Sequence, residues 1–152
     1  MTIDSIEIRG RVTSHAQAAG WFGQVLKREP VSAPGSGFTY AVWVSDLSPV
    51  PASSGLASTT ARLELTGRIY VPADTEPMDD VDDQLVGATD VLMTAYSGGF
   101  TLGGNVRCID LLGAYGAALR ARYGYLPIDS TTYRIATMTI PIIVNNAWTQ
   151  EA

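Results

Sequence analysis

Residues 61–71, ARLELTGRIYV, decide the fold class of this chain. Leu63, Leu65, Ile69 and Val71 fall on alternate positions, with mostly polar side chains between them. This period of two is that of an extended strand, whose successive side chains point to opposite faces of a sheet. The stretch therefore predicts a strand with one face in the core and the other in water or against another surface.

Two helices are predicted, one before and one after this strand. The first runs from Asp4 to Gly20, because Asp4 and Glu7 have the spacing of a capping box and glycine is a common helix stop. Gly10 disfavours a helix interior, so a start near Thr13 is the alternative. The second follows Pro72 and ends at Gly98, and its acidic start favours the helix dipole. Its apolar stripe, spaced by three and four residues, consists of Met78, Val81, Leu85, Ala88, Leu92, Ala95 and Tyr96.

Further strands are expected at residues 21–29, 38–45, 106–112, 119–126 and 133–144. The stretch PIDSTT, which joins the last two, suits a hairpin turn. Pro141 has no N–H to donate, so the final strand is expected at a sheet edge or with a bulge near its end. The pattern predicts a single α+β domain over residues 1–152. In it, a mixed, mostly antiparallel sheet of five to six strands carries the two helices.

Residues 46–60, DLSPVPASSGLASTT, predict a long exposed loop within this domain, because they are rich in Pro, Ser and Thr and show no helical period. Loops longer than about 12 residues are uncommon in compact domains and are often functional or disordered. Val50 and Leu56 would be apolar side chains exposed to water, which is unfavourable. A partner could cover them, or they could pack on their own domain.

The composition limits the classes of function. The chain has 152 residues, which suits one domain, and 46% of them are hydrophobic while only 16% are charged. Such a surface is suited to contact with other proteins. The net charge of -5 argues against binding to a phosphate backbone, which needs clustered Lys and Arg. The first residues lack the features of a secretory signal, so synthesis in the cytoplasm is expected.

The sequence shows no pattern for catalysis, a metal or a cofactor. His15 has no recognisable nucleophile set beside it, and Cys108 lies in the stretch VRCID of a predicted strand, so both are interpreted as structural. The run DTEPMDDVDD lacks the ligand order of a calcium loop, and GGFTLGGN lacks the Lys of a P-loop. An enzyme or ligand-binding domain remains an alternative. Its pocket would be lined by Trp21, Trp43, Tyr123 and Tyr125, without a convergent polar group.

Five stretches of this chain recur, in the same order, in one known family. They are AVW at 41–43, SGLAST at 54–59, AYSGGFTLGGNVR at 95–107, DLLGAYG at 110–116 and TMTIPIIVN at 137–145. With the acidic helix among them, the chain resembles the tail terminator proteins of long-tailed bacteriophages, also called minor tail or tail completion proteins. It is especially similar to those of phages that infect actinobacteria. The resemblance extends over nearly the whole chain and includes no catalytic motif.

The resemblance implies a structural virion protein and not an enzyme. Proteins of that family form a ring, usually a hexamer, on the last ring of tail tube protein. They stop tube growth at the length set by the tape measure protein and offer a surface to the neck or head-completion proteins. The implied location is the head–tail junction of the virion, after assembly in the host cytoplasm. No cofactor, membrane or sequence-specific nucleic acid is implied. A head-closure or neck connector protein is the alternative within the same virion.

Ten residues are candidate contacts in such a ring. Apolar contacts to a neighbouring subunit or to the tube are expected from Val50, Leu56, Phe100 and Leu102. Arg120 and Arg122 could meet the acidic helix start of the next subunit, or these charges could simply be solvated. The acidic residues in question are Asp79, Asp80, Asp82 and Asp83.

Overall fold

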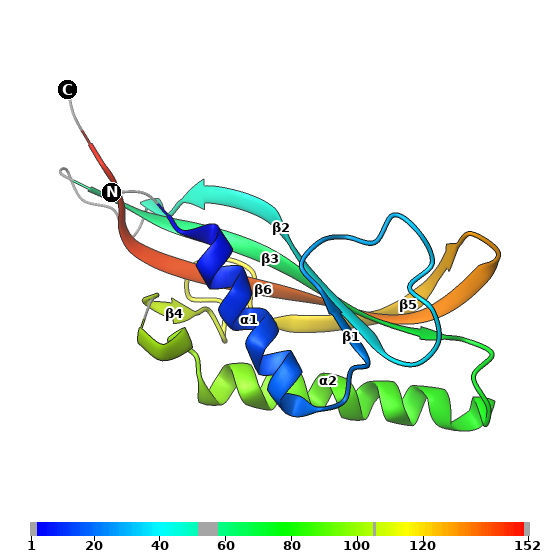
Figure 1. The fold of residues 1–152 in the computed structure, drawn as a ribbon. Coiled ribbons are helices and arrows are strands. Elements are labelled where there is room, and N and C mark those ends of the chain that lie inside the picture. The colour runs from blue at the N-terminus through cyan, green and yellow to red at the C-terminus, as the bar shows by residue number, and fades with distance from the viewer. Residues whose placement is uncertain (1–2, 52–57, 105, 151–152) are drawn as a thin grey trace.

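The computed structural model describes residues 3–51, 58–104 and 106–150, and in them two helices pack on one six-stranded sheet (Figure 1). The predicted α+β class is therefore confirmed. In chain order the elements are α1 (Ser5–Ala19), β1 (Gln24–Leu26), β2 (Thr39–Pro49), β3 (Ser58–Pro72), α2 (Val81–Gly98), β4 (Cys108–Ile109), β5 (Arg120–Ile128) and β6 (Thr131–Thr149). Short 3-10 turns at Met78–Asp80 and Leu102–Gly104 flank α2.

The sheet has the order β1-β2-β3-β6, and both β4 and β5 pair with the remaining side of β6. β1 runs parallel to β2, and the other neighbouring strands of the described sheet are antiparallel. The longest ladder joins β3 to β6, from Ser58 opposite Thr149 to Pro72 opposite Tyr133. β3 and β6 are thus the central strands.

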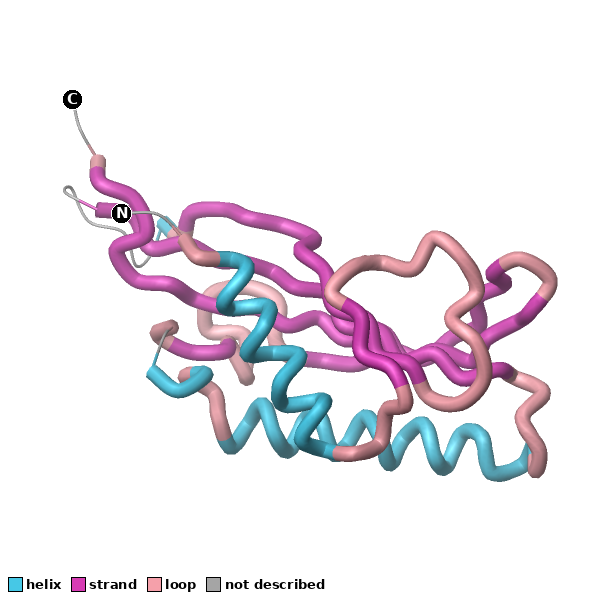
Figure 2. The backbone as a smooth tube through the Cα atoms, in the orientation of Figure 1, coloured by secondary structure: helices cyan, strands magenta, loops and turns pink. Residues whose placement is uncertain are grey.

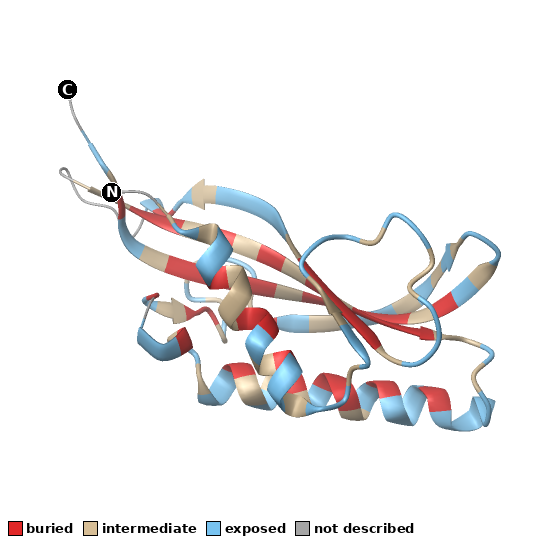
Figure 3. Ribbon diagram, in the orientation of Figure 1, coloured by how far each residue is buried: buried red, intermediate tan, exposed pale blue. Residues whose placement is uncertain are grey.

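The two faces of the sheet differ as the alternation in residues 61–71 predicts. Leu63, Leu65, Ile69 and Val71 are buried in one core with residues of both helices, so this side is called the helix face (Figure 3). The opposite side, called the open face, carries the side chains of the alternate residues of β3. Burial of a large aliphatic side chain contributes roughly 1.5–3 kcal/mol, so the helix face supplies most of the driving force for folding.

The first helix begins and ends where the sequence predicts. The Asp4 carboxylate accepts a hydrogen bond from the Glu7 N–H at 3.1 Å, and Gly20 closes the helix in the left-handed conformation with φ of 73°. The second helix begins later than predicted. Met78 lies in the preceding 3-10 turn and is exposed, so it does not belong to the buried stripe that starts at Val81.

The segment between β1 and β2 lies over one end of the open face (Figure 2). Ala33, in this segment, packs with Ala41, Tyr70 and Tyr133 in a second, smaller apolar cluster. Its backbone N–H also donates to the Asp129 carboxylate at 3.0 Å, next to the turn between β5 and β6. The open face is therefore covered at this end and accessible beyond it.

The predicted loop at 46–60 is largely strand in the described residues. β2 continues through Asp46 to Pro49, paired with residues 61–64, and β3 already begins at Ser58. A bulge between Val44 and Asp46 shifts the alternation of side chains by one position, which hid the second half of β2 from a period-two pattern. Residues 52–57 lie outside the described residues.

Pro141 is in a central strand and not at an edge, and the second alternative is found: β6 has a bulge near its end, where the register shifts between the Thr59–Trp148 and Ala61–Val144 pairs. β6 pairs with β5 up to Thr139 and with β4 from Ile142, and Pro141 lies at the change of partner. Its carbonyl accepts the Asp110 N–H at 2.9 Å. The N–H that proline lacks is not needed there, because no ladder bond uses that donor at the change of partner.

A pair of buried tyrosines ties both helices to the sheet. The Tyr96 hydroxyl donates to the Val12 carbonyl at 3.1 Å, so the Tyr40 hydroxyl is the donor in the 2.9 Å bond between the two rings. Burial raises the pKa of both hydroxyls, which keeps them neutral and able to donate. The Tyr40 ring lies over Gly67 of β3, where a Cβ would overlap the hydroxyl.

We expect Gly67→Ala to destabilise the fold by about 1–3 kcal/mol, because the added methyl group displaces the fully buried Tyr40 ring. Urea unfolding measures this loss. Gly10→Ala in α1 is the matched control, since nothing lies within 4 Å of its added Cβ. That control should stabilise the helix by up to about 1 kcal/mol. A Gly67→Ala variant as stable as the wild type would contradict the packing described here.

Candidate interaction surfaces

The sheet has two open edges, on its opposite sides. β1 covers only residues 39–41 of β2, and in the described residues positions 42–49 have no partner strand on the side away from β3. β5 pairs with β6, and no strand in the described part of the chain covers its other side. Unpaired strand edges present rows of free N–H and C=O groups and are natural sites for adding another strand.

The β2 edge carries exposed apolar side chains and one acidic residue. Val44 and Leu47 lie opposite Leu65 and Leu63, hence on the helix face, and their exposed fractions are 41% and 48%. Asp46 lies on the open face.

The β5 edge carries aromatic and basic side chains. Tyr123 and Tyr125 lie opposite Ala136 and Arg134 of β6, on the helix face, and both are exposed. Arg120 and Arg122 are also exposed and lie on the open face.

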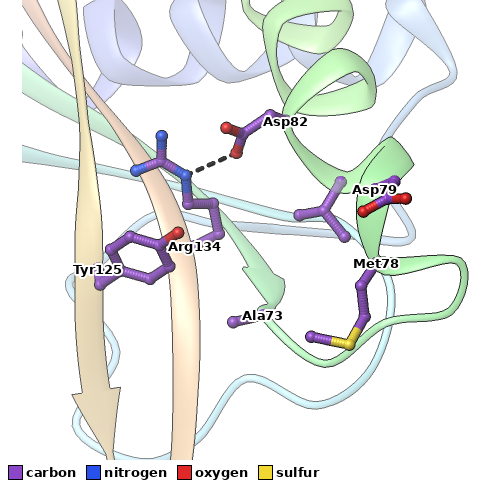
Figure 4. Close-up of a pocket in the computed structure, with 7 residues that line it drawn as sticks. Ala73, Met78, Asp79, Asp82, Tyr125 and Arg134 are labelled. Carbon is purple, nitrogen blue, oxygen red and sulfur yellow. Dashed lines mark hydrogen bonds and ion pairs between the residues drawn. The ribbon is translucent and has the colours of Figure 1, made fainter.

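Arg134 connects the β5 edge to the start of α2 (Figure 4). Its Nε donates to the Asp82 carboxylate at 2.7 Å, and its Nη1 donates to the Gly124 carbonyl at 3.0 Å. The guanidinium also lies 4.7 Å from the centre of the Tyr125 ring and 5.9 Å from that of Tyr123. An open cleft of about 350 Å³ adjoins the cluster and is lined by Ala73, Met78, Asp79, Val81, Asp82, Tyr125 and Arg134.

The electrostatics of this cluster follow from the ion pair. The hydrogen bond from Arg134 lowers the pKa of the Asp82 carboxyl below its usual value. The pair therefore contributes at neutral pH and is lost as the pH falls through the lowered pKa. Asp82 is largely exposed, so solvent weakens the contribution of the pair to stability, and its main effect is to fix Arg134 against the two tyrosines.

The four predicted apolar contact residues separate into three groups. Val50 and Leu102 have exposed fractions of 5% and 1%, so both pack inside their own domain and present little surface to a partner. Phe100 is 45% exposed and remains available. Leu56 lies outside the described residues.

The predicted charged residues lie in two separate places. Arg120 and Arg122 are on the open face, whereas the acidic start of α2 belongs to the helix layer. Of the four acidic residues, Asp82 already pairs with Arg134 of the same chain. Within the described residues no ion pair is formed by Arg120, Arg122, Asp79, Asp80 or Asp83. A contact between the two groups would have to be made between chains.

The aromatic pocket considered from the sequence is not assembled by the fold. Trp21 packs edge-on against Phe38 and near Gly87 of α2. Trp43 lies on the open face, where the Arg68 guanidinium is 5.3 Å from the centre of its ring. The two tyrosines of β5 lie on the helix face, so the four rings do not share a cavity.

The two reactive residue types have structural surroundings. The His15 Nδ1–H donates to the Arg11 carbonyl at 2.8 Å within α1, and burial with the nearby Asp110 charge raises the pKa of the Cys108 thiol. Among the described residues no cluster of three or more His, Cys, Asp or Glu side chains could hold a metal ion. None of the helices in that part of the chain is both long and apolar enough to span a membrane.

Sequence reasoning missed Arg134, Asp46 and Leu47 as surface candidates. The strand pattern at 133–144 does not show that Arg134 faces the start of the acidic helix. That placement depends on the register between β6 and β3. Asp46 and Leu47 were assigned to a loop because of the bulge.

Comparison with known proteins gives a likeness in fold. A scan against models of protein families found no match, and neither did a search of curated proteins. Among solved structures, the fold is similar to the cryo-EM structure of the sheath/tube terminator of an extracellular contractile injection system, PVC, in its extended state. The identity is 11% and the TM-score 0.48, and the alignment covers 100% of this chain and 60% of that chain. The chain thus spans 60% of that protein's length, and a likeness of this extent assigns it neither an activity nor a partner.

We expect Arg134→Met to return the pKa of the Asp82 carboxyl towards its ordinary value, because the substitution removes the hydrogen bond that lowers it. NMR titration of the side-chain carboxyl carbon measures the change. Arg120→Met is the matched control, since Arg120 has no ion-pair partner in the described residues, and it should leave this pKa unchanged. An unchanged pKa in Arg134→Met would mean that the ion pair does not persist in solution.

Proposed function

We propose that this chain is a structural protein of a long-tailed bacteriophage that assembles as a ring on the end of the tail tube and terminates its growth. The observation that supports the proposal most is the pair of different open edges, β2 and β5, on opposite sides of one sheet. A contact between two different edges is heterologous, and its repetition around an axis closes a ring. We propose the tail tube as the partner because of the sequence resemblance to tail terminator proteins.

The proposed role is binding alone, without a catalytic step. The surface suits such a role, because only 16% of the residues are charged and large hydrophobic side chains are exposed on several elements. Phe100 is the apolar residue that we propose for contact with the tube or a neighbour. The finished ring, proposed as a hexamer at the head–tail junction, would present its other side to a neck or head-completion protein. The solved structure described above is also a terminator by name, but the proposal does not rest on that likeness.

Electron microscopy of tails assembled with and without this protein tests the proposed function. With the protein, tube lengths should cluster around one value and heads should be joined to tails. Without it, tubes should grow past that length or remain without heads, because nothing covers the growing end. Purified protein should also bind one end of isolated tubes.

Uniform tubes with heads attached in the absence of this protein would contradict the proposal. Binding of the purified protein to filled heads, and not to tubes, would instead indicate a head-closure or neck protein. The two outcomes are distinguished by counting label on tube ends and on heads in the same preparation.

A further inference from the structure

We propose that copies of this chain associate by pairing the β2 edge of one subunit with the β5 edge of the next, so that one sheet continues from subunit to subunit. The partner of each edge is thus a second copy of the chain. The inference rests on the proposed function, since it gives the contact from which the ring would be built.

The direction of the strands permits this contact. Three antiparallel pairs, β2–β3, β3–β6 and β6–β5, separate the two edges, so β5 runs opposite to β2. A second copy that keeps its helices on the same face of the sheet therefore brings its β5 antiparallel to β2. Antiparallel pairing gives the straight inter-strand hydrogen bonds that an open edge offers.

The helix-face sides of the two edges match in chemistry. Val44 and Leu47 on β2 are exposed apolar side chains, and Tyr123 on β5, with 42% of its surface exposed, is an aromatic one. Pairs of aromatic and β-branched side chains are favourable across antiparallel strands. Arg134 holds the Tyr123 side of this surface in place through its bonds to Asp82 and Gly124.

The open-face sides of the two edges are complementary in charge. Asp46 lies directly opposite Glu64 of β3, and Glu64 already receives the Arg62 guanidinium at 2.8 Å. Asp46 forms no ion pair in the described residues and sits beside a like charge, which is unfavourable. Arg120 and Arg122 of the next subunit would supply the missing cation.

One register satisfies both faces at once. With Asp46 opposite Arg122 of the next subunit, Leu47 falls opposite Ala121. Residues 120–125 of β5 then lie along the unpaired part of β2, and the end of the β5–β6 hairpin must turn away beyond them, because β1 already pairs residues 39–41. The bulge after Val44 then places Val44 beside Tyr123, on the same face. Because of the bulge in β2, side chains that face each other across the two edges lie on the same face of the sheet on both sides of the bulge.

This contact gives Arg122 a different partner from the acidic start of α2. Asp79, Asp80, Asp82 and Asp83 belong to the helix layer, while Arg122 points to the open face. A sheet that continues in one plane keeps these two layers apart. Asp46, on the open face, is the acidic residue that such a continuation brings to the arginine.

Charge-reversed variants, followed by native mass spectrometry, test the contact. Asp46→Arg and Arg122→Asp, each alone, should lose the ring species because each places like charges across the interface. Asp83→Arg is the matched control, because it makes the same change of charge at an exposed position of the first turn of α2. It should assemble like the wild type.

Mixing the two defective variants gives the decisive result. In an alternating assembly each Asp46→Arg subunit meets Arg122→Asp at one edge and a wild-type charge pair at the other. The equimolar mixture should therefore recover rings with an even number of subunits. Recovery would require both residues to lie in one head-to-tail interface, because two unrelated defects would not correct each other.

A cysteine pair checks the register without a change of charge. In a Cys108→Ser background, Leu47→Cys combined with Ala121→Cys should form disulfides between subunits on oxidation, producing a ladder of covalent oligomers. The two positions lie at opposite edges of the sheet in one chain, so an intrachain bond cannot form.

Three outcomes would overturn the inference. They are normal assembly of Asp46→Arg, a mixture that stays dissociated, or disruption by Asp83→Arg in place of Asp46→Arg. A wild-type chain that stays monomeric both in solution and on tail tubes would contradict the proposed function as well. Wild-type rings that tolerate Asp46→Arg would contradict the edge contact alone.

Discussion

The antiparallel ladder between β3 and β6 is the constraint on which the rest of the structure depends. It pairs residues 58–72 with residues 133–149, so the intervening chain, including α2, must pack back on the sheet. The ladder also fixes which side chains face the helices and which face outward, since a shift of one residue would exchange the two faces. Gly67 in β3 makes room for Tyr40, whose hydroxyl joins β2 to α2 and, through Tyr96, to α1. The partners of β6 on its other side then leave β5 as an edge.

Much of the fold could be predicted from local sequence, and the parts that failed depend on pairing between distant residues. The cap of α1 at Asp4, the buried stripe of α2 from Val81 and the alternation in β3 all follow from spacing within a few residues, and the structure confirms them. The second half of β2 was missed because its bulge breaks the period that identifies a strand. The two alternatives for the strand of Pro141, an edge or a bulge near its end, could not be separated from local sequence. The choice depends on the bulge opposite Thr59 and Ala61 and on the point where β5 gives way to β4.

The candidate contact residues show the same division. Exposure of Phe100, Arg120 and Arg122 agrees with a role at the surface, whereas Val50 and Leu102 are isolated apolar residues that their own domain buries. The residue types show the sign of each charged group, but the sequence does not show on which face of the sheet the group lies. Asp46 became a candidate only when the register placed it opposite Glu64, with two arginines exposed on the other edge. An assembly that continues the sheet would use both edges, and the unpaired backbone groups that make an isolated edge prone to aggregation would be satisfied.

Hydrogen–deuterium exchange of the free and assembled protein tests most directly whether the sheet edges form the ring. Amide groups of residues 42–49 and 120–125 that point away from the sheet should exchange quickly in the free chain, and assembly should protect them, because they gain partners across the new ladder. Amide groups around Asp79 and Asp80, in the exposed 3-10 turn, should exchange at the same rate in both states. Equal exchange at both strand edges before and after assembly, with protection appearing at the acidic turn, would contradict this account.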